Sequence, residues 1–254
     1  MLNRLKLCKF GLMLFFLSCM NTAFAEEFQI ATAGHFLLTL QELLRIFEKE
    51  TGNKAVITTT SMGVLFTKVK EGAPFDILLS GDISTPIKIE QEGLGIANTR
   101  FSYAIGKLVL WSPNPALVDK KGEILKTGNF AHLALAHPER APYGIAAKNT
   151  LQQLELWQSL QAKLLIEEDP MPTYKKVLAG EAELGLLPLS LLNPSKKIEG
   201  SLWIVPNNLS GRLEHQAILL NHGEHNNAAK AFFTFLKSAR AKNVIESFGY
   251  SLPK

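Results

Sequence analysis

The strongest constraint on the fold is the alternation of strand and helix patterns in the first part of the chain. Short apolar or β-branched segments predict strands at residues 28–33, 55–60 and 75–79. Apolar residues at helical spacing predict helices between and after these strands, at residues 36–51, from Ser61 to Gly72, and at 85–92. This order favours an α/β fold with a mainly parallel sheet and helices on both faces.

The same plan restarts after an apolar strand predicted at residues 107–111. Further strands are predicted at residues 133–136, 164–167, 183–187 and 216–220. Helices are predicted after Pro142-Tyr143-Gly144 to about Leu156, from Pro170 onward, and at 227–248. We therefore expect two domains, residues 26–106 with 217–254, and residues 107–216. The chain would cross between them near residues 103–108 and near 213–217.

Four strand-to-helix junctions are expected to face one cleft, because ligands of open α/β sheets bind beyond the carboxyl ends of the strands. The junctions are Gly34-His35, Thr60 to Gly63, Ala141 to Gly144, and Asp169 to Pro172. A helix start presents unpaired N–H groups and a partial positive charge, so it can hold an anion. The simpler interpretation of Ser61 is a helix cap with no ligand.

The first 25 residues predict a cleavable signal peptide. Arg4, Lys6 and Lys9 form a basic start, residues 10–20 are apolar but too short to span a bilayer, and Ala23-Phe24-Ala25 fits a cleavage site. Three of the 27 Lys and Arg residues lie in this segment, so the remaining chain is nearly neutral against its 23 acidic residues. We expect a soluble exported protein that does not bind nucleic acid.

Both cysteines, Cys8 and Cys19, lie in the same segment, so the mature chain is expected to lack disulfides and thiol chemistry. A lipoprotein anchored through Cys19 is the alternative, but Phe16-Leu17-Ser18 is a poor context for lipid attachment. We therefore favour the cleaved, periplasmic form.

Sequence motifs for catalysis are missing from the chain. It has no Gly-x-Ser-x-Gly, P-loop, dinucleotide or His-Glu-x-x-His motif. His222 with His225 could hold a metal, and Asp76 with Asp82 could form a carboxylate pair, but an exposed loop and a turn residue are the simpler interpretations. The pattern favours a binding protein over an enzyme, with no cofactor and no metal.

Four segments resemble one family, in order and with compatible spacing. They are residues 72–82 (GAPFDILLSGD), 100–112 (RFSYAIGKLVLWS), 137–147 (HPERAPYGIAA) and 180–185 (GEAELG). Together they resemble the periplasmic molybdate-binding proteins of ABC transporters. The resemblance implies a monomeric two-domain clamshell of the periplasmic-binding-protein type. It would close on molybdate or tungstate and deliver the anion to a permease with its ATPase.

The resemblance also implies site residues. Ser61 matches the serine of the second loop of the family's site, with Gly63 close behind it, and Tyr143 falls where the third loop offers a backbone N–H. His35 stands where the first loop usually has Ser or Asn. If protonated, it would add a charged donor and make binding pH-dependent.

Other positions depart from the family pattern. Met62 replaces a hydroxyl, Pro170 falls where a backbone N–H is expected and has none, and Pro188 aligns near a tyrosine of some members. Met171 would donate instead if the loop shifts by one residue. These departures leave two alternatives open, a receptor for another anion or small acid, and a periplasmic sensor or interaction protein with a degenerate pocket.

Overall fold

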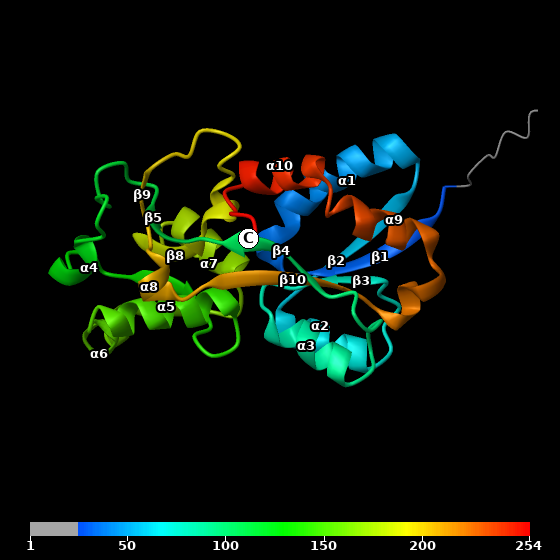
Figure 1. The fold of residues 1–254 in the computed structure, drawn as a ribbon. Helices are drawn as coiled ribbons and strands as arrows, with labels where there is room; N and C mark the ends of the chain where they lie inside the picture. Colours follow the sequence, from blue (N-terminus) through cyan, green and yellow to red (C-terminus); the bar gives the residue numbers. More distant parts are fainter. Residues whose placement is uncertain (1–24) are drawn as a thin grey trace, which may run out of the picture.

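The computed structural model describes residues 25–254, so the predicted signal peptide lies outside the described residues apart from Ala25. Two five-stranded sheets form two lobes that lie side by side (Figure 1). The first lobe contains the sheet β2-β1-β3-β10-β4, and the second contains β7-β6-β8-β5-β9. The predicted α/β class with two sheets flanked by helices is confirmed.

The strands have the following bounds. In the first sheet they are β1 (Glu27–Thr32), β2 (Lys54–Thr59), β3 (Ile77–Leu79), β4 (Phe101–Gly106) and β10 (Leu213–Leu219). In the second they are β5 (Leu108–Ser112), β6 (Leu133–Ala136), β7 (Leu164–Glu167), β8 (Leu184–Pro188) and β9 (Ser201–Ile204).

The helices cover both faces of each sheet. In the first lobe they are η1 (Gly34–Phe36), α1 (Leu37–Thr51), α2 (Met62–Lys70), α3 (Ser84–Gln91), η4 (Asn221–His225), α9 (Asn227–Phe235) and α10 (Ala239–Ser247). In the second they are α4 (Ile124–Thr127), α5 (Pro142–Gln153), α6 (Trp157–Leu160), η2 (Gln161–Lys163), α7 (Pro170–Leu178), η3 (Leu189–Leu192) and α8 (Asn207–Ser210). None of the helices within residues 25–254 combines the length and apolar character needed to cross a bilayer.

The two sheets repeat one strand plan. In the first, β1 pairs in parallel with β2 and β3, and β10 runs antiparallel to β3 and β4. In the second, β6 pairs in parallel with β7 and β8, and β5 runs antiparallel to β8 and β9. Because parallel strands end at the same sheet edge, the loops after β1, β2, β6 and β7 emerge on matching sides of their lobes.

Several predicted elements differ from the structure: α5 begins at Pro142 and ends at Gln153, and β3 begins at Ile77. The single helix expected at residues 227–248 is two helices, because the Ser238 hydroxyl accepts a hydrogen bond from the Ala241 N–H at 3.1 Å and starts α10. The strand expected at 216–220 begins at Leu213, which pairs with Gly106. The strands β4 and β9 were not predicted, and each lies at the edge of its sheet.

Apolar clusters lie on both faces of the first sheet. Above it in Figure 1, α1, α9 and α10 enclose a phenylalanine-rich cluster, and below it α2 and α3 cover a second cluster that contains Leu65 and Ile89. Phe232 is fully buried, with its ring 5.4 Å from that of Phe28 and 5.2 Å from that of Phe47, centroid to centroid. These contacts fix α9 against β1 and α1.

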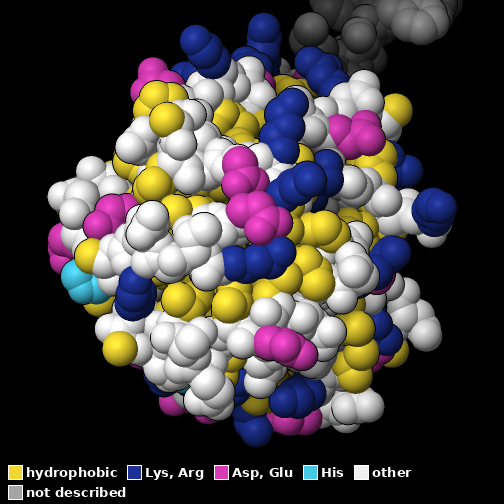
Figure 2. All heavy atoms as spheres, turned by 90° about the vertical axis from the view of Figure 1, so that its left-hand side faces the viewer, with side chains coloured by type: hydrophobic (Ala, Val, Ile, Leu, Met, Phe, Trp, Pro, Cys, Tyr) yellow, Lys and Arg dark blue, Asp and Glu magenta, His cyan; other side chains and the backbone are white. Residues whose placement is uncertain are grey.

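Side chains of both charges cover the end of the second lobe that faces the viewer in Figure 2, interspersed with apolar ones. Pairs such as Lys126 with Glu123, and Lys176 with Glu181, are ion pairs of this lobe. Their side chains are largely in solvent, so each contributes little to stability. The lobe is held by its apolar clusters instead.

We expect Phe232→Ala to lower the free energy of unfolding by about 3–5 kcal/mol, because it leaves a cavity between three packed elements. Denaturant titration of the mature protein measures the change. Ile166→Ala is the control, since this side chain is 48 % exposed, and it should cost less than about 0.5 kcal/mol. A loss below 1 kcal/mol for Phe232→Ala would contradict this packing.

Candidate functional site

The four predicted junctions meet in a cleft between the lobes. One cavity of about 500 Å³, here called the α7 cavity, is lined by Gly34, Thr60 and Ser61 from the first lobe and by Asp169 and Met171 from the second. A second cavity of about 480 Å³, here called the α5 cavity, is lined by residues on both sides, Ser61 to Val64, Arg140, Pro142, Ile145 and Glu168 among them. Because both cavities share Ser61, Val64 and Glu168, they are neighbouring parts of one cleft.

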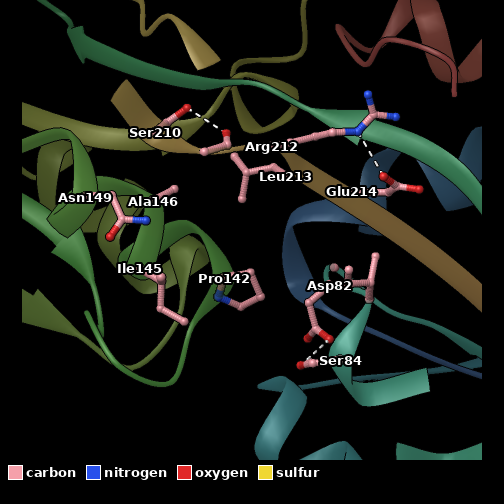
Figure 3. A pocket seen from close by; sticks show the side chains of 13 residues that line it. Asp82, Ser84, Pro142, Ile145, Ala146, Asn149, Ser210, Arg212, Leu213 and Glu214 are labelled. Atoms are coloured by element: carbon pink, nitrogen blue, oxygen red, sulfur yellow. Dashed lines mark hydrogen bonds and ion pairs between the residues drawn. The ribbon is translucent and has the colours of Figure 1, made fainter. Parts of the chain in front are cut away.

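A third cavity of about 230 Å³ lies beside them, where α5 faces the first lobe (Figure 3). Pro142 and Ile145 point from α5 toward the loop that carries Asp82 and Ser84. The Asp82 carboxylate accepts hydrogen bonds from the Thr85 N–H at 2.6 Å and from the Ser84 hydroxyl at 3.0 Å, so it caps the start of α3. This agrees with the interpretation of Asp82 as a turn or cap residue.

Asp76 lies apart from Asp82, and its side chain has a structural role. It is buried, and its carboxylate contacts His222 Nδ1 at 2.7 Å and accepts a hydrogen bond from the Gln29 N–H at 2.6 Å. No cluster of potential metal ligands occurs within residues 25–254. The Asp76–Asp82 pair therefore offers no joint chemistry.

Ser61 occupies the N-cap position of α2, but its side chain makes no capping hydrogen bond. Its backbone is extended, and its carbonyl accepts the first helical bond from the Leu65 N–H at 3.0 Å. The cap interpretation therefore explains the position of Ser61 without using its hydroxyl. Ser61 lines both cavities, and Met62 and Gly63, whose N–H groups lie in the first turn of α2, line the α5 cavity.

Met62 turns away from the cleft. Its side chain is buried in the apolar cluster under α2, and its sulfur lies 3.9 Å from the Ser80 hydroxyl. Gly63 is exposed, and a Cβ there would meet open space, so nothing in this conformation requires a glycine. The second junction therefore offers one hydroxyl and backbone N–H groups.

The start of α7 carries few donors because two of its first three residues are prolines. Pro170 and Pro172 have no N–H, and Thr173 donates its N–H to the Asp169 carbonyl at 3.2 Å. Within this turn, the N–H of Met171 alone is left to a ligand. A Cβ on Gly34 would lie 3.6 Å from Met171 Cβ, so the first and fourth junctions face each other across the cleft.

His35 is fully buried between the lobes. Its ring centroid lies 4.9 Å from that of Tyr143, which comes from the second lobe, and 4.9 Å from that of His215 on β10. A Cβ on Gly81 would come within 2.5 Å of the His35 ring, so glycine at 81 makes room for the imidazole. Among the described residues, His35 Nε2 and His215 Nδ1 have no hydrogen-bond partner.

Burial lowers the pKa of His35 to about 3, and burial beside His35 lowers the pKa of His215 well below its usual value. His35 is therefore neutral at physiological pH. Without an anion beside it, His35 is held neutral by burial, and its role as a charged donor to a bound anion stays a prediction.

Tyr143 begins α5 with Pro142 and joins the two lobes. Its side chain is buried, and its hydroxyl lies 3.5 Å from His215 Nε2. A Cβ on Gly144 would come within 2.2 Å of the His137 carbonyl oxygen, so the helix start needs glycine there. The Tyr143 N–H lies in this first turn, where backbone donors are unpaired.

Three residues of this region were not predicted from the sequence. The Ser190 hydroxyl donates to the His35 carbonyl at 3.0 Å, and the Tyr250 hydroxyl donates to Ser190 at 2.9 Å. His215 completes the group. Only their place at strand ends or near the carboxyl terminus could have marked them, and that signal is weak. Pro188, at the end of β8, leads into the η3 turn that carries Ser190.

Two α/β lobes that enclose a cleft lined by helix starts define a two-domain ligand-binding protein. The family described as bacterial extracellular solute-binding protein matches residues 28–251. The molybdate-binding protein ModA of Azotobacter vinelandii is 39 % identical over 229 residues, which cover 90 % of this chain and 91 % of that protein. ModA of Rhodobacter capsulatus is 37 % identical over 228 residues, covering 90 % and 89 %.

The solved structure of the Azotobacter vinelandii periplasmic molybdate-binding protein matches with a TM-score of 0.86 and 33 % identity, over 89 % of this chain and 100 % of that one. The chain therefore belongs to the bacterial extracellular solute-binding proteins, within the molybdate-binding protein family. These relatives are named as molybdate-binding proteins, and the solved structure is named as a periplasmic one.

The buried histidines predict a pH dependence of stability. In the unfolded chain a histidine has a pKa near 6.5, so below that pH the unfolded state binds more protons than the folded state. Stability should fall as pH drops from about 6.5 toward 5, by up to about 1.4 kcal/mol per pH unit for each histidine.

We expect His35→Asn to reduce that slope, measured by denaturant titration at several pH values, since it removes one of the two buried groups. Asp169 also has a pKa shifted by burial, to about 6. It is present in the wild type and in His35→Asn, so its contribution cancels when the two slopes of stability against pH are compared. His132→Asn, at an exposed position, should keep the wild-type slope. Equal slopes for wild type and His35→Asn would show that His35 is charged in the folded state.

Proposed function

We propose that the protein is the periplasmic solute-binding component of an ABC importer that captures a tetrahedral oxyanion, molybdate or tungstate, in the cleft. The observation that carries this is Ser61, which stands at a helix start, makes no capping hydrogen bond with its side chain and lines both cavities. The family relatives named for molybdate support the choice of ligand.

The ligand would be held by neutral donors. Ser61 offers its hydroxyl, and the N–H groups of Met62, Tyr143 and Met171 lie in the first turns of α2, α5 and α7. Such helix starts stabilise an anion through aligned dipoles and unpaired N–H groups. His35 would line the site with its neutral side chain, or would contact the anion through its backbone. Gly63 and Pro170 would also lie beside the anion.

The lobes would act as two domains, residues 26–106 with 217–254 and residues 107–216, which close on the anion as a monomeric clamshell. β4 runs directly into β5 and β10 crosses back, so two neighbouring connections form the hinge. The closed form would then dock on the permease, and its ATPase would drive transport. A signal peptide ending at Ala25 would direct the protein to the periplasm.

The first turn of α7 offers a bound anion fewer N–H donors than the first turn of a helix without prolines. A missing hydrogen bond to a buried dianion costs about 1.5–3 kcal/mol, or about one to two decades of affinity. The absent donors at Pro170 and Pro172 therefore predict weaker capture than a site with a full first turn would give.

Calorimetry of the mature protein with molybdate, tungstate, sulfate and phosphate tests the proposal. We expect binding of molybdate or tungstate, and Ser61→Ala should weaken it by about tenfold to a hundredfold, because one hydrogen bond to the anion is lost. Ser159→Ala, on an exposed helix of the second lobe, is the control. Unchanged affinity in Ser61→Ala would remove Ser61 from the site, and no heat with any anion would contradict the function.

A further inference from the structure

Asp169 is an acidic residue that lines the cleft where the proposed ligand is an anion. It is the N-cap residue of α7, yet its side chain makes no capping hydrogen bond. It lines the α7 cavity with Gly34, Ser61 and Met171. Burial raises its pKa to about 6, with no contribution from a charged or hydrogen-bonding partner.

The charged and titratable groups near Asp169, among residues 25–254, form no ion pair with its carboxyl group. They are Glu168 and Lys175 beside the same cavity, Glu167 on β7, Lys176 on α7, His35 on η1 and His137 after β6. Glu168 pairs with Arg140 at 2.8 Å, and Lys176 pairs with Glu167 and Glu181. His35 is neutral. Across the cavity, Thr59, Thr60, Ser61 and Val64 carry no charge.

We propose that Asp169 determines which oxyanions the cleft accepts, by requiring one proton between its carboxylate and the bound anion. This inference rests on the proposed function. A carboxylate and a fully ionised oxyanion are both hydrogen-bond acceptors, so they repel and cannot bond without a shared proton. When molybdate binds, one proton passes from the buffer acid to the Asp169 carboxylate, which then donates to an anion oxygen, and the buffer is left as its conjugate base.

Ligands that carry their own proton behave differently. Hydrogen phosphate, or a singly protonated phosphonate, brings an O–H that donates to the ionised Asp169 carboxylate. No proton is then taken from solvent. Above the pKa of the free carboxyl group, the affinity for a full dianion should fall about tenfold per pH unit. The affinity for a protonated oxyanion should stay nearly level while that ligand keeps its proton.

The test is calorimetry of the mature protein with molybdate at pH 7.5, in Tris and in HEPES, whose ionisation heats differ. We expect the wild type to take up close to one proton per anion bound. Asp169→Asn should take up none and should bind molybdate at least tenfold more tightly at this pH. Asp169→Ser is the second variant, because serine also suits an N-cap position.

Glu167→Gln is the matched control, since Glu167 lies two residues away, pairs with Lys176 and does not line the α7 cavity. It should keep the wild-type proton uptake. A phosphate titration at pH 7.5 should show no uptake in the wild type and weaker binding in Asp169→Asn. Thermal unfolding of each variant reports that it is folded.

Molybdate binding without proton uptake in the wild type, or with uptake retained in Asp169→Asn and Asp169→Ser, would overturn the role of Asp169 and leave the proposed function standing. Absence of molybdate, tungstate and phosphate binding by wild type and Asp169→Asn, at pH 6 and at pH 8, would overturn the proposed function and this inference with it.

Discussion

The convergence of helix starts on one cleft is the constraint on which the rest of the structure depends. The helices α2, α5 and α7 each begin after a parallel strand, and the two sheets face each other through those ends. Their unpaired N–H groups need partners, and water or an anion provides them. A residue with an unpaired N–H or a hydroxyl at one of these helix starts therefore adds a hydrogen-bond donor to the cleft, and a proline there removes one.

The seam between the lobes, formed by His35, Tyr143, His215 and Tyr250, fixes how the helix starts face each other. Its rings pack at centroid distances of 4.9–6.0 Å, and Ser190 ties the second lobe to the His35 carbonyl. The glycine at 81 makes this packing possible by leaving room for the His35 ring. The neutral histidines keep the seam free of net charge, at a cost in stability at low pH.

Much of the fold could be predicted from the sequence, because the alternation of strands and helices is encoded locally. The strands β6 and β7 have the predicted bounds, and Gly52 ends α1 in a left-handed conformation as expected for a C-cap. The break at Ser238 was missed, because apolar residues keep a helical spacing on both sides of it. The edge strands β4 and β9 take their pairing from partners distant in the chain.

The candidate site was predicted in outline only. Sequence and family resemblance brought forward Ser61, Tyr143 and Met171, but the side chains of Met62 and Tyr143 take directions set by tertiary packing. Asp169 belongs to the fourth predicted junction, and the structure shows that it lines the α7 cavity and makes no capping hydrogen bond. Its raised pKa comes from burial in the folded protein, which no local pattern encodes.

The most direct test of the account is a crystal structure of the mature protein soaked with molybdate, with anomalous scattering used to locate the metal atom of the anion. The account predicts one anion in the cleft, held by the Ser61 hydroxyl and by N–H groups at the starts of α5 and α7, beside Asp169. An anion held instead by Arg140 or Lys175, or found outside the cleft, would contradict it.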